Sequence, residues 1–306
     1  MNRFAKFSWA VLAWLVLVIL WGTIVRATGS GAGCGSHWPS CNGQIIPTPG
    51  AIQTVIEFTH RIMSGGALIL ILIQLVWGLR IYPKGSQQRI GVIGSAVFIL
   101  VEAMLGAGLV LLELVQENSS ALRAVAVALH LLNTFILLAF VAISAWWASG
   151  GKRLAPVGHN KFSFTLLAAG LAGVALIGMS GAVTALGDTL FPSDSIAHSL
   201  AQQADASAHF LVRLRIYHPL IAIFVGVYSL YLTQYFHQQA DTSPVSRRLC
   251  RILAGLLVLQ AGAGMTNVLL LAPLWMQVIH LLLADSVWIV YILLSASILS
   301  TTKEDA

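Results

Sequence analysis

The stretch 8–26, SWAVLAWLVLVILWGTIVR, decides the class of fold. It is apolar almost throughout and has no charged residue before Arg26. A helix needs about 20 mostly apolar residues to cross the hydrocarbon core of a bilayer, so this stretch predicts a transmembrane helix. Seven more stretches of the same kind follow at about 54–79, 89–112, 122–147, 162–186, 210–236, 249–271 and 275–299. The sequence therefore predicts an all-α membrane protein with eight transmembrane helices.

The composition supports the same class. Of the 306 residues, 58% are hydrophobic and 9% are charged, whereas soluble domains have about 25% charged residues. There is too little polar surface for a globule in water, which excludes a cytosolic enzyme, a disordered protein and a nucleic-acid binder. The first stretch is too long for the apolar region of a signal peptide and no small-x-small cleavage site follows it, so we expect it to be retained.

The distribution of cations predicts the orientation in the cell membrane. Alternate connections hold twelve of the seventeen Lys and Arg residues: Arg3, Lys6, Arg80, Lys84, Arg89, Lys152, Arg153, Lys161, Arg247, Arg248, Arg251 and Lys303. Positive charge favours the cytoplasmic side, so we expect both termini there and outer loops at 27–53, 113–121, 187–209 and 272–273. The other arginines lie near outer helix ends: Arg26, Arg61, Arg123, Arg213 and Arg215. They either snorkel to the interface or pair with acidic groups of a bound ligand.

The chain contains an internal repeat. VRATG at 25–29 matches VTALG at 183–187, and Glu57 to His60 matches Arg215 to His218 at the same offset of 158. Glu102 and Gly106 match Gln260 and Gly264 at that offset, and HLL at 130–132 recurs at 280–282, 150 positions later. Because each repeat has four helices, both halves have the same orientation. We expect two tandem four-helix bundles, residues 1–150 and 151–306, related by a pseudo-two-fold axis along the membrane normal.

Four histidines fall in the outer halves of predicted helices: His60, His130, His218 and His280. Ionisable residues at membrane depth are costly and are usually functional or paired. Interhelical hydrogen bonds explain one such histidine as well as a ligand role does, but two repeat-related pairs favour metal ligation. Facing imidazoles suit the two axial positions of a haem, and no Cys or carboxylate cluster completes a bare-metal site. The pairs His60/His130 and His218/His280 therefore predict two haem sites.

The two halves differ next to these histidines. Glu57 lies one turn before His60, whereas the second half has Arg215 at that position. This carboxylate is either a proton acceptor or a stabiliser of developing positive charge, or an interfacial Glu paired with Arg61 or Arg123. Glu102 and Asp285 also lie inside predicted helices, and we assign them no role.

The first outer loop contains Cys34 and Cys41 within GCGSHWPSCNG at 33–43. Disulfides are permitted outside the cytoplasm, and the Gly and Pro residues allow the chain to turn back. Such a bridge is either redox-active or a staple of the loop. Cys250, at the other end of the bundle, is expected to be an inert buried thiol. The loop and end histidines His37, His159, His198 and His237 are expected to be solvated.

These residues resemble the heme A synthase family, membrane enzymes that convert heme O to heme A for cytochrome oxidase. The resemblance rests on VRATGSG at 25–31, on the loop motif at 33–43, on Glu57-x-x-His60-Arg61, and on the three later histidines. It spans essentially all eight helices. The loop motif together with Glu-x-x-His-Arg is its specific part.

The resemblance implies a division of labour between the halves. The first half holds heme O as substrate on His60 and His130, and the second holds haem b, an iron cofactor, on His218 and His280. The C8 methyl of heme O is oxidised to a formyl group through a hydroxymethyl, with haem b relaying electrons. Glu57 matches the catalytic carboxylate of the family, and Cys34 and Cys41 match its disulfide pair. Heme O synthase is the implied partner for haem delivery, and a homo-oligomer is compatible with the sequence.

This sequence departs from the family pattern in two places. The second outer loop lacks the Cys pair of many members, so that pair cannot be required here. Pro219 follows His218, and a proline inside a helix kinks it. This leaves His209 as a competing ligand, although the constant offset favours His218.

Two other functions remain open at this stage. A bis-His electron-transfer cytochrome shares the four histidines but does not need Glu57 or the cysteines. A transporter built on a parallel repeat predicts broken helices and polar sites at the midplane. The sequence leaves the oxygen source, the electron acceptor and the oligomeric state undetermined.

Overall fold

The computed structural model describes residues 2–48, 50–155, 160–239 and 242–300. Two residues named above, His159 and Lys303, lie outside these ranges. Within them the chain is all-α, with two isolated β-bridges and no strand. Seven of the predicted stretches are single helices whose ends lie within a few residues of the predicted ones: α1 (Arg3–Ala27), α2 (Ile52–Ile81), α3 (Gln87–Leu111), α4 (Ala121–Ala148), α5 (Lys161–Leu190), α9 (Pro244–Leu269) and α10 (Leu274–Ile298).

The sixth stretch differs from the prediction of one helix. It consists of a short α7 (Phe210–Leu214) and a long α8 (Tyr217–Gln238). The ring of Pro219 would collide with the carbonyl of Arg215 in a continuous helix. The new helix therefore begins at Tyr217, so that the proline lies in its first turn, where its missing N–H costs little.

A further short helix, α6 (Ile196–Ala204), lies in the outer loop at 187–209 and was not predicted. The Ser195 side chain caps it by accepting a hydrogen bond from the backbone N–H of His198. A 3-10 turn, η1 (Ser30–Ala32), follows α1.

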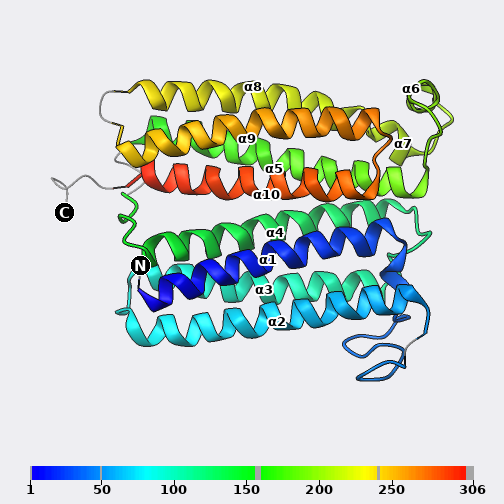
Figure 1. Ribbon diagram of the computed structural model, residues 1–306, viewed down its shortest axis with the longest axis horizontal. Helices are drawn as coiled ribbons and strands as arrows, with labels where there is room; N and C mark the ends of the chain where they lie inside the picture. Colours follow the sequence, from blue (N-terminus) through cyan, green and yellow to red (C-terminus); the bar gives the residue numbers. More distant parts are fainter. Residues whose placement is uncertain (1, 49, 156–159, 240–241, 301–306) are drawn as a thin grey trace.

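In the described part of the chain, eight spans are long and apolar enough to cross a membrane, with α7 and α8 counted as one span. The molecule is a multi-pass membrane protein of this type. The described chain begins and ends at the same end of the helices (Figure 1). An even number of membrane crossings places the first and last described residues on the same side. The cytoplasmic assignment of that end stays a prediction.

The helices form two groups that lie side by side (Figure 1). The first bundle consists of α1 to α4, and the second of α5, α8, α9 and α10, with α4 and α1 packed against α5 and α10. Phe135 of α4 stacks on Trp288 of α10 at a centroid distance of 4.8 Å. The Trp288 indole N–H also donates to the Phe135 carbonyl at 2.6 Å. This buried aromatic pair joins the bundles, while their pseudo-two-fold relation stays a prediction.

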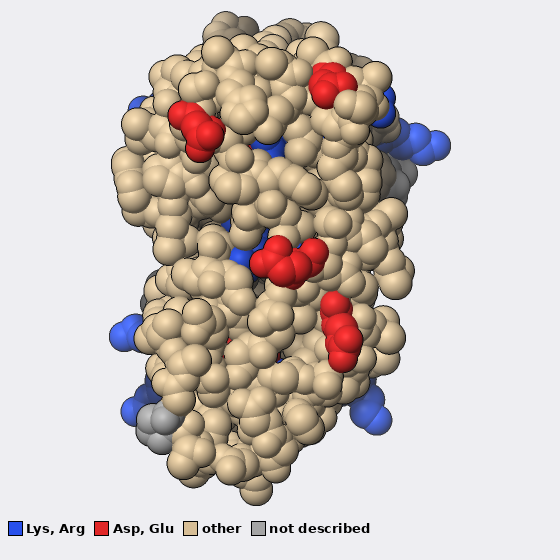
Figure 2. All heavy atoms as spheres, turned by 90° about the vertical axis from the view of Figure 1, so that its right-hand side faces the viewer, with Lys and Arg blue, Asp and Glu red and all other residues tan. Residues whose placement is uncertain are grey.

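Figure 2 shows the predicted outer end of the molecule, where acidic side chains are scattered over a mostly uncharged face. The exposed acids of the outer loops are Glu113, Glu117, Asp194 and Asp205. Blue atoms of Lys or Arg show in recesses near the centre of this face and beyond its rim (Figure 2). This end therefore combines acidic loop tips with recessed arginines.

Candidate functional site

In the second bundle, the structure places His218 and His280 face to face. The ring of His218, at the start of α8, lies 6.4 Å from that of His280 on α10, with the planes at 88°. Two metal–imidazole bonds of about 2.0 Å each separate facing nitrogens by about 4 Å. The distance from each nitrogen to its ring centre brings the centroid spacing close to the observed value. The spacing of the pair fits axial ligation of a haem.

His209, the competing ligand, makes different contacts. It caps α7, where its Nδ1 accepts a hydrogen bond from the Leu211 N–H at 3.3 Å. Its ring stacks on Phe191 at 4.7 Å. His218 instead shares a hydrogen bond with the Ser180 hydroxyl at 3.1 Å. The contact with His280 thus belongs to His218.

In the first bundle, His60 on α2 and His130 on α4 lie close enough to interact electrostatically. The Nδ1 atoms of both rings are buried and have no hydrogen-bond partner, and His280 Nδ1 is in the same condition. Buried polar atoms are normally paired, so the unpaired Nδ1 atoms at three of the four positions fit a ligand-binding role. No group of three His, Cys, Asp or Glu side chains that could hold a bare metal ion occurs within the described ranges.

Glycines lie against these imidazoles. A Cβ built on Gly22 would lie 3.2 Å from His60 Cε1, and one on Gly181 would lie 2.9 Å from His218 Cε1. The repeat-related Gly106 and Gly264 approach Cε1 of His130 and His280 in the same way, at 3.9 and 3.1 Å. At Gly22, Gly181 and Gly264 the missing side chain lets the imidazole pack directly against the backbone of the neighbouring helix, which fixes the position of each ring.

Glu57 is buried and fixes the outer loop to α2. Its Oε2 accepts the backbone N–H of Cys34 at 2.8 Å, and its Oε1 is paired with the Arg61 guanidinium. Arg61 also donates to the carbonyls of His37 and Ser40, each at 2.6 Å. The pairing with Arg61 that we considered for Glu57 is therefore present. The same carboxylate also contacts the cysteine loop.

Cys34 and Cys41 form a disulfide. The loop lies so close to α2 that a Cβ on Gly33 would overlap the Gln53 backbone. The Thr54 hydroxyl donates to the Gly33 carbonyl at 2.7 Å. The disulfide therefore closes a loop whose backbone is held by the first turns of α2, directly before His60.

Removing the disulfide is expected to loosen this loop. In the double variant Cys34→Ser/Cys41→Ser, loss of the closed loop should cost about 2–3 kcal/mol, mostly as local opening around Cys34. The N–H bond to Glu57 then opens more often, and hydrogen exchange measured by mass spectrometry on a peptide containing Cys34 should accelerate by about tenfold or more. Cys250→Ser, at the buried free thiol, is the control. Equal exchange in all three proteins would contradict this stapling role.

The recessed arginines contact protein acceptors. Arg26 of α1 reaches the second bundle, where it donates to the Ala185 carbonyl at 2.7 Å and to Gln277 Oε1 at 2.6 Å. Arg215 is 5% exposed and pairs with Asp188 at 2.9 Å. Arg123 donates to the Asn118 carbonyl at 2.7 Å, and its Nε is buried without a partner. Arg213 is exposed.

The remaining predicted positions vary in their surroundings. His37 and His198 are exposed, as expected for solvated residues, while His237 is half-buried. Cys250 is buried, as predicted. Asp285 is 0% exposed, and neither of its carboxylate oxygens has a hydrogen-bond partner.

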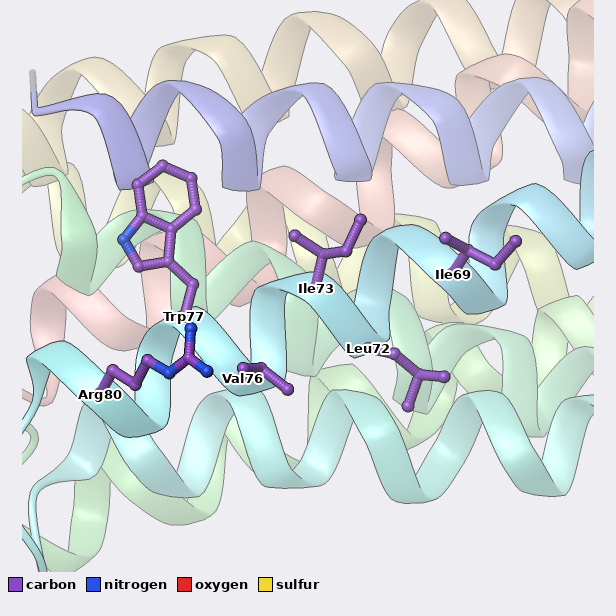
Figure 3. Close-up of a pocket in the computed structure, with 6 residues that line it drawn as sticks. All are labelled: Ile69, Leu72, Ile73, Val76, Trp77 and Arg80. Carbon is purple, nitrogen blue, oxygen red and sulfur yellow. The ribbon is translucent and has the colours of Figure 1, made fainter.

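A groove of about 610 Å³ runs along α2, lined by Ile69, Leu72, Ile73, Val76, Trp77 and Arg80 (Figure 3). Ile69 follows His60 by nine residues, which is two and a half helical turns. The groove therefore opens on the opposite face of α2 from His60. It belongs to the apolar outer surface of the helix and not to the imidazole pair.

Sequence reasoning missed several contact residues of the site. Ser180 contacts His218, Asp188 pairs with Arg215, and Gly22 and Gly181 face imidazoles. Ser180 and Gly22 occupy equivalent positions at the 158-residue offset. This correspondence could have pointed to both residues from the sequence, because both positions lie just before the aligned VRATG and VTALG segments.

The structure thus defines a helical membrane protein with facing imidazoles in the second bundle, two neighbouring histidines in the first, and a disulfide loop fixed next to His60. The family model of cytochrome oxidase assembly proteins (COX15-CtaA) matches residues 5–292. The chain belongs to this family, which confirms the resemblance drawn from its motifs.

Individual relatives extend the comparison. The chain is 48% identical over 298 residues to a protoheme IX farnesyltransferase of Thermus thermophilus, covering 97% of this chain and 49% of the relative. It is 42% identical over 98 residues to a heme A synthase of Halalkalibacterium halodurans, covering 31% of this chain and 32% of the relative. A Bacillus cereus heme A synthase is 37% identical over 111 residues, covering 36% of each. The chain spans about half the length of the Thermus relative.

Proposed function

We propose that this protein is a heme A synthase, an oxidoreductase that converts the C8 methyl of heme O to a formyl group through a hydroxymethyl. The observation that supports this most directly is the asymmetry between the bundles. Both have histidines in the outer part of the bundle, and Asp285 is a buried carboxylate of the second bundle, but among the described residues a buried carboxylate bonded to a disulfide loop is found in the first bundle alone, at Glu57. An electron-transfer cytochrome would need neither group.

In this proposal, the first bundle binds the substrate. His60 and His130 hold heme O, and the loop fixed on α2 closes the outer end of this site. Glu57 Oε2 is the atom that accepts a proton from the reacting methyl carbon or its hydroxylated product. The buried position of Glu57, 3% exposed, keeps bulk water away from this carboxylate. Arg26 and Arg123, recessed at the outer end, are candidates to pair with the propionates of a haem.

The second bundle would hold haem b through His218 and His280. When bound, that cofactor supplies a one-electron acceptor for electrons leaving the substrate. Ser180 and Gln260 orient the two imidazoles from α5 and α9.

Substrate supply is expected from an enzyme that farnesylates protoheme. The Thermus relative bears the name of such a transferase and is twice as long as the segment that matches this chain. We therefore expect this chain to receive heme O from a heme O synthase in the same cell membrane.

The proposal is tested by expressing the protein in cells that make heme O but lack a heme A synthase. Membrane haems are extracted and identified by mass spectrometry. Appearance of heme A together with its hydroxymethyl precursor supports the proposal. Accumulation of heme O alone, in cells that contain the folded protein, would refute it.

A further inference from the structure

Glu102, to which the reaction above assigns no role, belongs to a polar cluster beside His130. Its Oε2 accepts a hydrogen bond from Asn133 Nδ2 at 2.6 Å, and its Oε1 accepts one from the Thr134 hydroxyl at 2.5 Å. Oε1 also lies 3.6 Å from His130 Nε2. Two donors on α4 thus hold a carboxylate of α3 in contact with the imidazole of a proposed ligand.

The equivalent place in the second bundle is built differently. Gln260 occupies the position of Glu102 at the 158-residue offset, and its Nε2 lies 3.5 Å from His280 Nε2. The positions equivalent to Asn133 and Thr134, 150 residues later, are Leu283 and Ala284. Gln260 Oε1 is accordingly buried without a partner. Each bundle therefore has a polar side chain against the equivalent histidine, but in the described residues only the first has a carboxyl group there, held by two donors.

A purely structural role does not require this charge. Asn133 and Thr134 are each 5% exposed and the Glu102 side chain is 19% exposed, and a carboxylate in such surroundings at membrane depth is costly. An amide at this position could still accept one hydrogen bond from α4 and would avoid the cost of a carboxylate in a largely apolar place. The second bundle uses an amide at this position. The charge in the first bundle therefore calls for a role at the imidazole.

We infer that Glu102 is a positioning residue that orients His130 and strengthens it as an iron ligand, so that a haem in the first bundle has a lower reduction potential than one in the second. A carboxylate next to a ligating imidazole fixes its orientation and raises its basicity, and stronger donation to the iron favours the oxidised haem. This inference rests on the proposed function. The difference in potential would direct electrons from the substrate half to the cofactor half.

The test uses the purified 306-residue chain loaded with haem b as the probe, in a His218→Ala background so that the first-bundle site is observed alone. Glu102→Gln, which introduces the second-bundle residue, should shift the midpoint potential of this haem to more positive values. Glu102→Ala should weaken haem binding by about 10- to 100-fold. Unchanged potential and affinity in both variants would overturn the inference.

Two matched variants separate positioning from helix packing. Gln260→Glu, in a His60→Ala background, should shift the second-bundle haem to more negative potential. Asn133→Leu/Thr134→Ala, which copies Leu283 and Ala284, should shift the first-bundle haem in the same direction as Glu102→Gln. Loss of thermal stability in Glu102→Gln without any shift in potential would assign Glu102 to packing alone and contradict the inference.

The outcome is distinguishable from that of the proposed function. A wild-type protein that makes no heme A, but shows the Glu102→Gln shift, contradicts the function and supports the positioning role. If the wild type makes heme A but Glu102→Gln leaves the haem potential unchanged, the result supports the proposed function and contradicts the positioning role.

Discussion

Glu57→Gln should bind haem as the wild type does and form heme A at least about 100-fold more slowly, because a general base typically contributes a factor of this size or more. Both partners of the carboxylate are donors, the Cys34 N–H and the Arg61 guanidinium. An amide has one acceptor oxygen and cannot satisfy both or take up a proton. The measurement is the initial rate of heme A formation, with bound haem determined in parallel by absorbance.

A control is needed because Glu57 also holds the loop. Thr54→Val removes the hydrogen bond from the Thr54 hydroxyl to the Gly33 carbonyl and weakens the same loop without touching the carboxylate. This variant should lose about 1 kcal/mol of local stability in the loop. Its rate of heme A formation should stay within a few-fold of the wild-type rate. Glu117→Gln, at an exposed outer-loop acid, should change nothing. Full activity of Glu57→Gln, or an equal loss in Thr54→Val, would contradict the catalytic role.

The histidine variants have the second large effect, since each pair is proposed to hold one haem. His60→Ala or His130→Ala should abolish binding of heme O and all product formation while leaving the haem b of the second bundle in place. His218→Ala or His280→Ala should remove haem b and also stop product formation, but should leave heme O bound. Bound haem per chain should fall by about half in every case, as measured from extracted haem and protein concentration.

His209→Ala provides the matched control for the second bundle. Its ring stacks on Phe191 and Phe210, so haem content should be unchanged. Loss of haem b in His209→Ala with retention in His218→Ala would reverse the ligand assignment. Circular dichroism of each variant checks that the helices remain folded.

The sequence predicted the helices well because hydropathy and length determine transmembrane spans almost alone. The eight membrane-spanning stretches could be predicted without any information on tertiary contacts. Pro219 indicated a kink in the sixth stretch. The residue at which the helix breaks depends on the carbonyl that the proline ring would contact, which is that of Arg215. The short helix α6 was missed, because its nine residues are too few and too polar to stand out in a search for membrane-spanning stretches.

The site was only partly predictable. The offset of 158 related His60 to His218 and Glu102 to Gln260, and the offset of 150 related His130 to His280. These offsets did not reveal that the side chains of Glu102 and Gln260 each contact an imidazole, since those contacts depend on the packing of α3 on α4 and of α9 on α10. The hydrogen bond from Cys34 to Glu57 involves a backbone donor, which leaves no trace in residue identity. The pairing of Asp188 with Arg215 was also missed. Asp188 lies on α5 and Arg215 lies between α7 and α8, so their contact depends on how these segments pack.

The central claim is that each bundle ligates one haem between two histidines and that the first of these haems is modified. The most direct test extracts the haems from the purified protein and weighs them by mass spectrometry. The account predicts haem b together with heme O, its hydroxymethyl derivative or heme A. Haem b alone would indicate an electron-transfer cytochrome, the absence of any haem would indicate a transporter, and either result would contradict the account.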